Sequence, residues 1–119
     1  MRESAVVKHL KKVVAEMRGT TRKVKWEGRK HAPDLLILLP LTSCWVETKA
    51  PKKGATLGQQ REHARLRASG MKVFVLDSVE AVDEWRHEIV GRQIAQAEAR
   101  NEFMAGVQKR MFGKGKTNG

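Results

Sequence analysis

Residues 33–49 of this chain of 119 residues read PDLLILLPLTSCWVETK. The apolar run from Leu35 to Leu39 is typical of a β-strand that is buried on both faces. Residues 40–42 predict a turn, and residues 44–49 predict a strand that returns beside the first. We therefore expect a β-hairpin whose most apolar part is flanked by charged residues.

The expected hairpin places two acidic residues opposite each other. If the turn is centred between Pro40 and Leu41, Asp34 pairs with Glu47, and the Cβ atoms of such a pair lie ~5 Å apart. Lys49 points to the same face as Glu47, because side chains alternate along a strand. One face would thus present two carboxylates and an ammonium, although a one-residue bulge would reverse this parity.

Two neighbouring carboxylates repel each other unless a cation lies between them. Mg²⁺ prefers oxygen ligands in octahedral geometry and keeps several waters. Asp34, Glu47 and the backbone carbonyl of Thr48 are the protein ligands that we expect. Such an ion polarises a phosphoryl oxygen and activates its water, while Lys49 orients the nucleophile or stabilises the developing charge. The hairpin therefore predicts phosphodiester hydrolysis.

The remaining patterns predict one α/β domain with a helical appendage. Residues 4–17 carry apolar side chains at helical spacing, and residues 22–27 alternate as an exposed basic strand. After the hairpin we expect, in order, a helix over 56–69, a buried strand over 72–76, a helix that begins at Ser78, and a long helix over 88–112. The domain core would span residues 1–87, and residues 113–119 would form a disordered basic tail.

The charge of the chain favours a polyanionic partner. There are 24 Lys and Arg residues against 13 Asp and Glu, so the net charge is +11, and nucleic acid is the first candidate. We expect phosphate contacts from basic residues around the hairpin, namely Arg22, Lys23, Lys25, Arg29, Lys30, Lys52 and Lys53. The first five could also form a solvated face, whereas the last two directly follow the second hairpin strand.

Composition also excludes some classes of protein. No apolar run approaches the ~20 residues of a membrane-spanning helix, and the first residues do not resemble a signal peptide. The single cysteine, Cys44, excludes an internal disulfide and fits a reducing compartment. We therefore expect a cytoplasmic protein without a membrane partner.

Pro33-Asp34 followed by Glu47-Thr48-Lys49 on a hairpin resembles the PD-(D/E)xK nuclease superfamily. More narrowly, the chain resembles the stand-alone VRR-NUC domains found in phage genomes. The resemblance covers roughly residues 2–77 and rests on four segments: the acidic residue Glu3, residues 28–38, residues 45–49, and a helix in which Gln59 lies eleven residues before Gly70.

The resemblance implies a restriction-endonuclease-like core of order αβββαβ with C-terminal helices. It also implies a nuclease that depends on Mg²⁺ or Mn²⁺, with Glu3, Asp34, Glu47, Lys49 and Gln59 in the site. A phage-encoded member would act in the cytoplasm of the bacterial host. The chain departs from the family at His31 or Ala32, where glycine is common, and at Glu62 and His63, where an aromatic residue is common.

Simpler interpretations exist for several of these residues. Asp34 could be a turn residue and Glu47 with Lys49 a surface ion pair. Glu3 could be favoured by the dipole of the first helix, and Gln59 could be a helix-surface amide. The histidines lack metal-ligand spacing, although His31 could touch phosphate; they are His9, His31, His63 and His87.

The long C-terminal helix predicts a homodimer. Its apolar residues follow the four-three spacing of a coiled-coil seam, formed by Val90, Ile94, Ala97, Asn101, Met104, Gln108 and Met111. Alternatively, the helix could fold back on its own sheet. Stand-alone VRR-NUC proteins are associated with dimers and Holliday-junction cleavage, and a two-fold pair of sites suits a junction with two equivalent strands.

These observations lead to one main function and two alternatives. The main function is a divalent-metal-dependent DNA endonuclease that selects branched DNA such as a four-way junction. The first alternative is a catalytically silent module that binds DNA structures, and the second is a partner-binding factor that uses residues 88–112.

Overall fold

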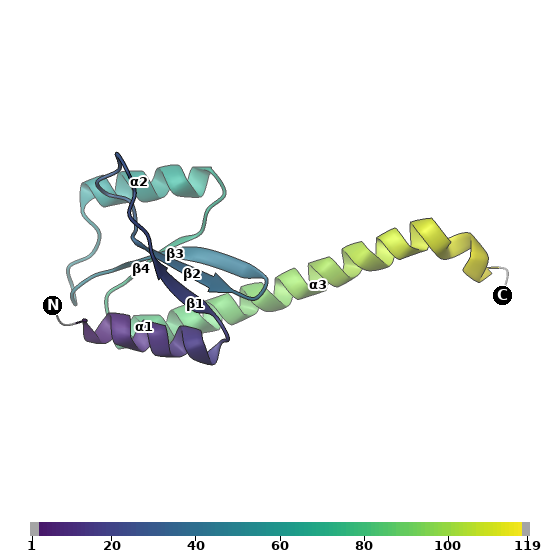
Figure 1. Ribbon diagram of the computed structural model, residues 1–119, viewed down its shortest axis with the longest axis horizontal. Coiled ribbons are helices and arrows are strands. Elements are labelled where there is room, and N and C mark those ends of the chain that lie inside the picture. The colour runs from purple at the N-terminus through teal and green to yellow at the C-terminus, as the bar shows by residue number, and fades with distance from the viewer. Residues whose placement is uncertain (1–2, 118–119) are drawn as a thin grey trace.

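A four-stranded sheet in the order β1-β2-β3-β4 forms the centre of the protein, in a computed structural model that describes residues 3–117 (Figure 1). The elements are α1 (Ala5–Glu16), β1 (Thr20–Lys23), β2 (Leu35–Leu39), β3 (Thr42–Thr48), α2 (Leu57–Ala68), β4 (Val73–Leu76) and α3 (Val79–Thr117). Helix α2 covers one face of the sheet, and α1 with the first part of α3 covers the other. The predicted α/β class and the order αβββαβ are confirmed.

The β2–β3 hairpin has the predicted register. Leu35 pairs with Val46 and Leu36 with Trp45, so one further step of the ladder sets Asp34 opposite Glu47. The connecting turn contains only two residues, and Leu41 adopts a left-handed φ of 65°, as the third position of a type II turn requires. Strand β1 is antiparallel to β2, whereas β4 is parallel to β3.

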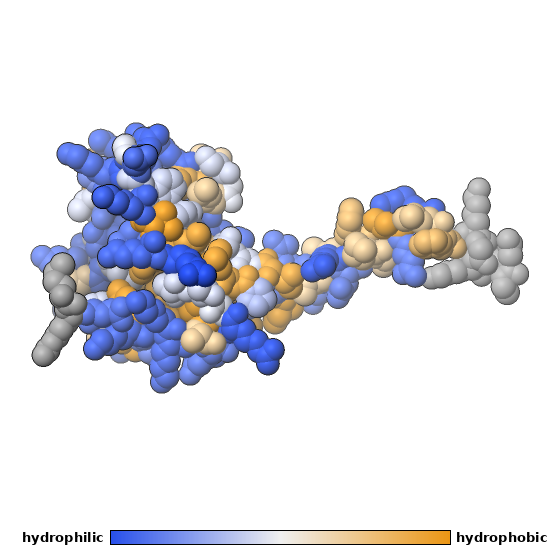
Figure 2. Space-filling model, viewed as in Figure 1, coloured by the Kyte–Doolittle hydropathy of each residue, from blue (hydrophilic) through white to orange (hydrophobic). Residues whose placement is uncertain are grey.

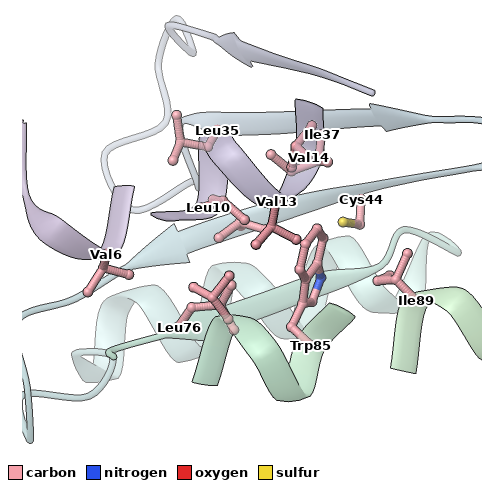
Figure 3. Close-up of a cluster of buried hydrophobic side chains, with 12 residues drawn as sticks. Val6, Leu10, Val13, Val14, Leu35, Ile37, Cys44, Leu76, Trp85 and Ile89 are labelled. Carbon is pink, nitrogen blue, oxygen red and sulfur yellow. The ribbon is translucent and has the colours of Figure 1, made fainter. Parts of the chain in front are cut away.

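Most of the core lies between the sheet and the pair α1 and α3 (Figure 3). Leu10 of α1, Ile37 of β2 and Ile89 of α3 are completely buried there. A smaller cluster under α2 contains Trp45, Leu66 and Val73. The burial of apolar surface in both layers holds the hairpin rigid between them.

The first strand and the hairpin differ in detail from their predictions. Strand β1 occupies residues 20–23 instead of 22–27, because the chain leaves the ladder after Val24 donates to the Asp34 carbonyl at 2.8 Å. Leu38 is 41% exposed, so β2 is not buried on both faces throughout. Leu36 packs against the smaller cluster under α2, whereas Leu38 does not.

Residues 79–117 form one helix, where the sequence predicted two helices and a disordered tail. The segment contains no proline, and a glycine inside a helix costs only about 1 kcal/mol relative to alanine, so nothing in it enforces a break. Asn118 and Gly119, the end of the predicted tail, lie outside the described residues.

The outer part of α3 projects from the domain, which gives the protein a length of 66 Å. Contact with the sheet continues to Gln93, whose amide donates to the Pro40 carbonyl at 3.0 Å. None of residues 94–113 is buried, so folding back on the sheet is wrong for this part of the helix. None of the helices in the described part of the chain combines the length and apolarity of a membrane span.

Candidate active site

Asp34 and Glu47 come together at the end of the hairpin that is remote from its turn. The Asp34 backbone is held by its bond to Val24, and the Lys49 amide donates to the Leu76 carbonyl of β4 at 2.9 Å. Because side chains alternate along a strand, Asp34 and Glu47 lie on the face that α2 covers. Thr48 lies on the opposite face, toward α1.

Two open clefts meet at Asp34. The first, of about 510 Å³, we call the Trp26 cleft, and it is lined by Lys23, Val24, Lys25, Trp26, Arg29, Lys30, Ala32, Asp34, Glu47 and Gln59. The second, of about 520 Å³, we call the Glu3 cleft, and it is lined by Glu3, Ser4, Val7, Lys11, Thr21, Lys23, Asp34, Leu35 and Thr48. Asp34 therefore lines both clefts.

The carboxylate of Glu47 is partly buried in the site. Burial raises its pKa to about 7, and the negative charge of Asp34 adds to the rise while the ammonium of Lys49 opposes it. Its Oε1 atom is buried and has no hydrogen-bond partner. Burying a carboxylate without a partner is unfavourable, so binding of a proton or a cation would stabilise this carboxylate.

His63 on α2 faces Glu47, and the sequence analysis did not identify it as a site residue. Its Nε2 lies 3.5 Å from Glu47 Oε1, and its side chain is only 2% exposed. Burial lowers the pKa of His63, and the charges of Arg67 and Lys49 lower it further. A signal existed in the sequence: His63 lies four residues after Gln59, and residues at that spacing share a helix face.

Glu3 lines a cleft with Asp34, and Gln59 lines a cleft with both Asp34 and Glu47. Glu3 shares its cleft with Asp34 and is ion-paired with Lys11. It precedes the N-cap residue Ser4, so it is not an acidic residue of the first helical turn. Gln59 shares the other cleft with Asp34 and Glu47, and its side-chain oxygen accepts from the Thr56 amide in a capping box.

The donor atoms fit a hard divalent cation. Within residues 3–117 no three His, Cys, Asp or Glu side chains converge as a metal cluster. Two carboxylates with one backbone carbonyl suit Mg²⁺ or Mn²⁺, which retain waters in the remaining positions.

Four of the seven predicted DNA-binding residues line the Trp26 cleft, namely Lys23, Lys25, Arg29 and Lys30. Arg29 is held near α2 by Glu62, at 3.8 Å, and Glu62 also pairs with Arg65 at 3.0 Å. Arg22, Lys52 and Lys53 are exposed and line neither cleft. The first four therefore share a cleft with both carboxylates.

Two known proteins are similar to this chain in sequence or structure. A protein described as "Putative nuclease p44", from Acyrthosiphon pisum secondary endosymbiont phage 1, is 44% identical over 79 residues, which are 66% of this chain and 85% of the relative. A solved structure described as a VRR_NUC domain matches with a TM-score of 0.62 and 40% identity, over 66% of this chain and 87% of that chain. No protein-family model matches the chain.

Proposed function

The chain belongs to the VRR-NUC nucleases, and from this premise we propose that it is a divalent-metal-dependent DNA endonuclease that selects branched DNA such as a four-way junction. The proposal is supported above all by Glu47, whose buried, unpartnered oxygen lies beside Asp34 in a basic cleft. A cation bound by these carboxylates would offset the repulsion between them.

Each residue of the site has a proposed role. Asp34, Glu47 and the Thr48 carbonyl hold the cation, which supplies an activated water and polarises a phosphoryl oxygen when it is bound. Lys49 stabilises the charge that develops on the phosphate. Gln59 retains its amide N–H groups for the phosphate, because its oxygen is used in the helix cap. Glu3 orients water from the neighbouring cleft.

The basic residues position the DNA rather than cut it. Lys25, Arg29 and Lys30 line the cleft that contains both carboxylates, so a phosphate backbone held by them passes over the site. Arg22, Lys52 and Lys53 lengthen the contact on either side. Because the phage protein is a relative and Cys44 is a free thiol, we place this activity in the cytoplasm of a bacterial host.

The decisive experiment is a panel of labelled linear duplexes, flaps and four-way junctions, incubated with Mg²⁺, Mn²⁺ or EDTA. Asp34→Ala and Glu47→Ala should abolish cleavage and retain DNA binding, because each removes negative charge from a positive surface. Lys49→Ala should retain the metal and cleave poorly. Glu98→Ala, on the exposed outer part of α3, is the matched control and should cleave normally.

Two outcomes would overturn parts of this proposal. Cleavage in EDTA, or normal cleavage by either carboxylate variant, would refute the metal site. Junction binding without cleavage under any condition would instead support a catalytically silent module that recognises DNA structure. Equal cleavage of duplex and junction would refute the proposed selectivity for branched DNA but not the nuclease activity.

We also propose that the outer part of α3 joins two copies of the chain. Large apolar side chains are exposed along it (Figure 2), with Ile94 at 55%, Met104 at 55% and Met111 at 68%. These three residues lie on the predicted seam, and a second copy would bury them. Two sites related by a two-fold axis would match the two equivalent strands of a junction.

Light scattering over micromolar concentrations tests the dimer. The wild-type protein should have twice the chain mass, and Ile94→Glu or Met104→Glu should shift it to the monomer. Gln96→Glu lies on the same helix outside the seam and should remain dimeric. A wild-type monomer would refute this interface without affecting the nuclease site.

A further inference from the structure

The imidazole of His63 is buried and lacks a hydrogen-bond partner at the atom that faces the site. Its Nε2 lies 3.5 Å from Glu47 Oε1, and both atoms are buried without a partner. Burying a polar group without a hydrogen-bond partner is unfavourable. Two orphaned polar atoms that face each other can satisfy each other after a shift of a few tenths of an ångström.

Two of the other charged groups around His63, Arg67 and Glu62, already have partners. The guanidinium of Arg67 donates to the Val73 carbonyl at 2.7 Å. The carboxylate of Glu62 accepts from Arg65 at 3.0 Å and lies 3.8 Å from Arg29. Glu47 is therefore the acceptor left for the buried nitrogen of His63.

We propose that His63 is a positioning residue of the nuclease site, in which its Nε2–H donates to Glu47 Oε1 and fixes the rotation of that carboxylate. This inference rests on the proposed function, because the carboxylate so held is the proposed cation ligand. With Oε1 held by the imidazole, Oε2 would remain as the cation ligand of Glu47. Such outer partners orient a ligand, and their loss typically weakens metal binding by about 10–100-fold.

Packing alone does not explain the residue. His63 is only 1% exposed, and an aliphatic side chain of similar size would fill the same volume without burying a polar atom. The neutral imidazole has one N–H group, and the position of that proton decides whether it donates to Glu47. The proposal therefore predicts one specific tautomer.

Two replacements of His63 separate the hydrogen bond from packing. His63→Leu removes the donor, whereas His63→Gln places an amide N–H near the former Nε2. The Kd for Mn²⁺ should rise by about 10-fold or more in His63→Leu and return to within a few-fold of wild type in His63→Gln. His87→Leu, at an exposed histidine of α3, should bind Mn²⁺ normally.

Cleavage gives a second signature. Activity of His63→Leu should recover at saturating Mn²⁺, since the variant weakens the metal site and leaves the reacting groups in place. Normal Mn²⁺ affinity in a folded His63→Leu would overturn the proposal. Equal weakening in His63→Gln and His63→Leu would also overturn it, because a donor at this position would then have no effect.

A readout without metal separates this inference from the proposed function. In ¹⁵N spectra of the metal-free protein, His63 should carry its proton on Nε2, and Glu47→Gln should shift that resonance. A proton on Nδ1 would overturn the positioning role even if the nuclease is metal-dependent. Normal Mn²⁺ binding and cleavage by Glu47→Gln would refute the metal site itself, whatever the tautomer of His63.

Discussion

The indole nitrogen of Trp26 donates a hydrogen bond of 2.7 Å to the carbonyl oxygen of Pro33. Pro33 immediately precedes Asp34, so this bond restrains the peptide that carries the first carboxylate of the site. The Trp26 ring also packs against Trp45, with ring centroids 4.9 Å apart. The Trp26 side chain thus links the start of the loop of residues 24–34 to the end of that loop, and it also links the loop to β3.

Trp26→Phe should loosen this loop while retaining most of its packing. The missing hydrogen bond should lower the free energy of unfolding by about 1 kcal/mol, as measured by urea titration. Cleavage should fall several-fold, because Asp34 is less well positioned. Unchanged stability and unchanged cleavage together would show that this bond does not restrain Asp34.

The stability of the metal-free protein should depend on pH through Glu47. Its pKa is raised from 4.5 to about 7 in the folded protein, so the stability that it contributes is full below pH 4.5 and is lost as the pH rises through about 7. Glu47→Gln should remove this pH dependence, which is measured in EDTA as the difference between the Tm at low pH and the Tm above pH 7. Mg²⁺ should restore stability above pH 7 in the wild type only.

DNA affinity should decrease steeply with salt. Neutralising Lys25 or Lys30, which line the Trp26 cleft, should weaken binding to all DNAs and reduce the slope of log K against log salt by ~0.9 for each phosphate that the variant no longer neutralises. Lys109→Gln, on the exposed outer part of α3, serves as the control. A flat salt dependence in the wild-type protein would contradict the role of its positive charge.

Two isoleucines of α3 should respond in opposite ways to truncation. Ile89 is completely buried, whereas Ile94 is 55% exposed. Ile89→Ala should lower the free energy of unfolding by about 2–5 kcal/mol, as measured in dilute monomer. Ile94→Ala should leave the monomer unchanged and weaken the dimer, as measured by sedimentation.

Cys44 should resist alkylation while the protein is folded. Burial raises the pKa of its thiol to about 11, and thiolates rather than thiols are the reactive species. Iodoacetamide at pH 8 should therefore modify Cys44 only in denaturant. Rapid modification of the native protein, at the rate of an exposed thiol, would show that the sheet opens readily at β3.

The sequence determined the hairpin and the pairing of its two carboxylates. A two-residue turn at Pro40-Leu41 fixes the register, and alternation along a strand then decides which side chains share a face. These are local rules that need no knowledge of distant residues. The same applies to the positive charge near Asp34 and to the cap of α2 at Thr56.

Only the tertiary structure decided the environment of that pair. Burial of Glu47 and its contact with His63 require α2 to lie over one particular part of the sheet, and no local periodicity specifies that position. The division of the site into two clefts arises because the strands separate the Asp34 side toward α1 from the side toward α2. The projection of α3 beyond Gln93 has a similar cause. Helical spacing shows which residues share one face of the helix, whereas the extent of the sheet decides how many of those residues are buried within the chain.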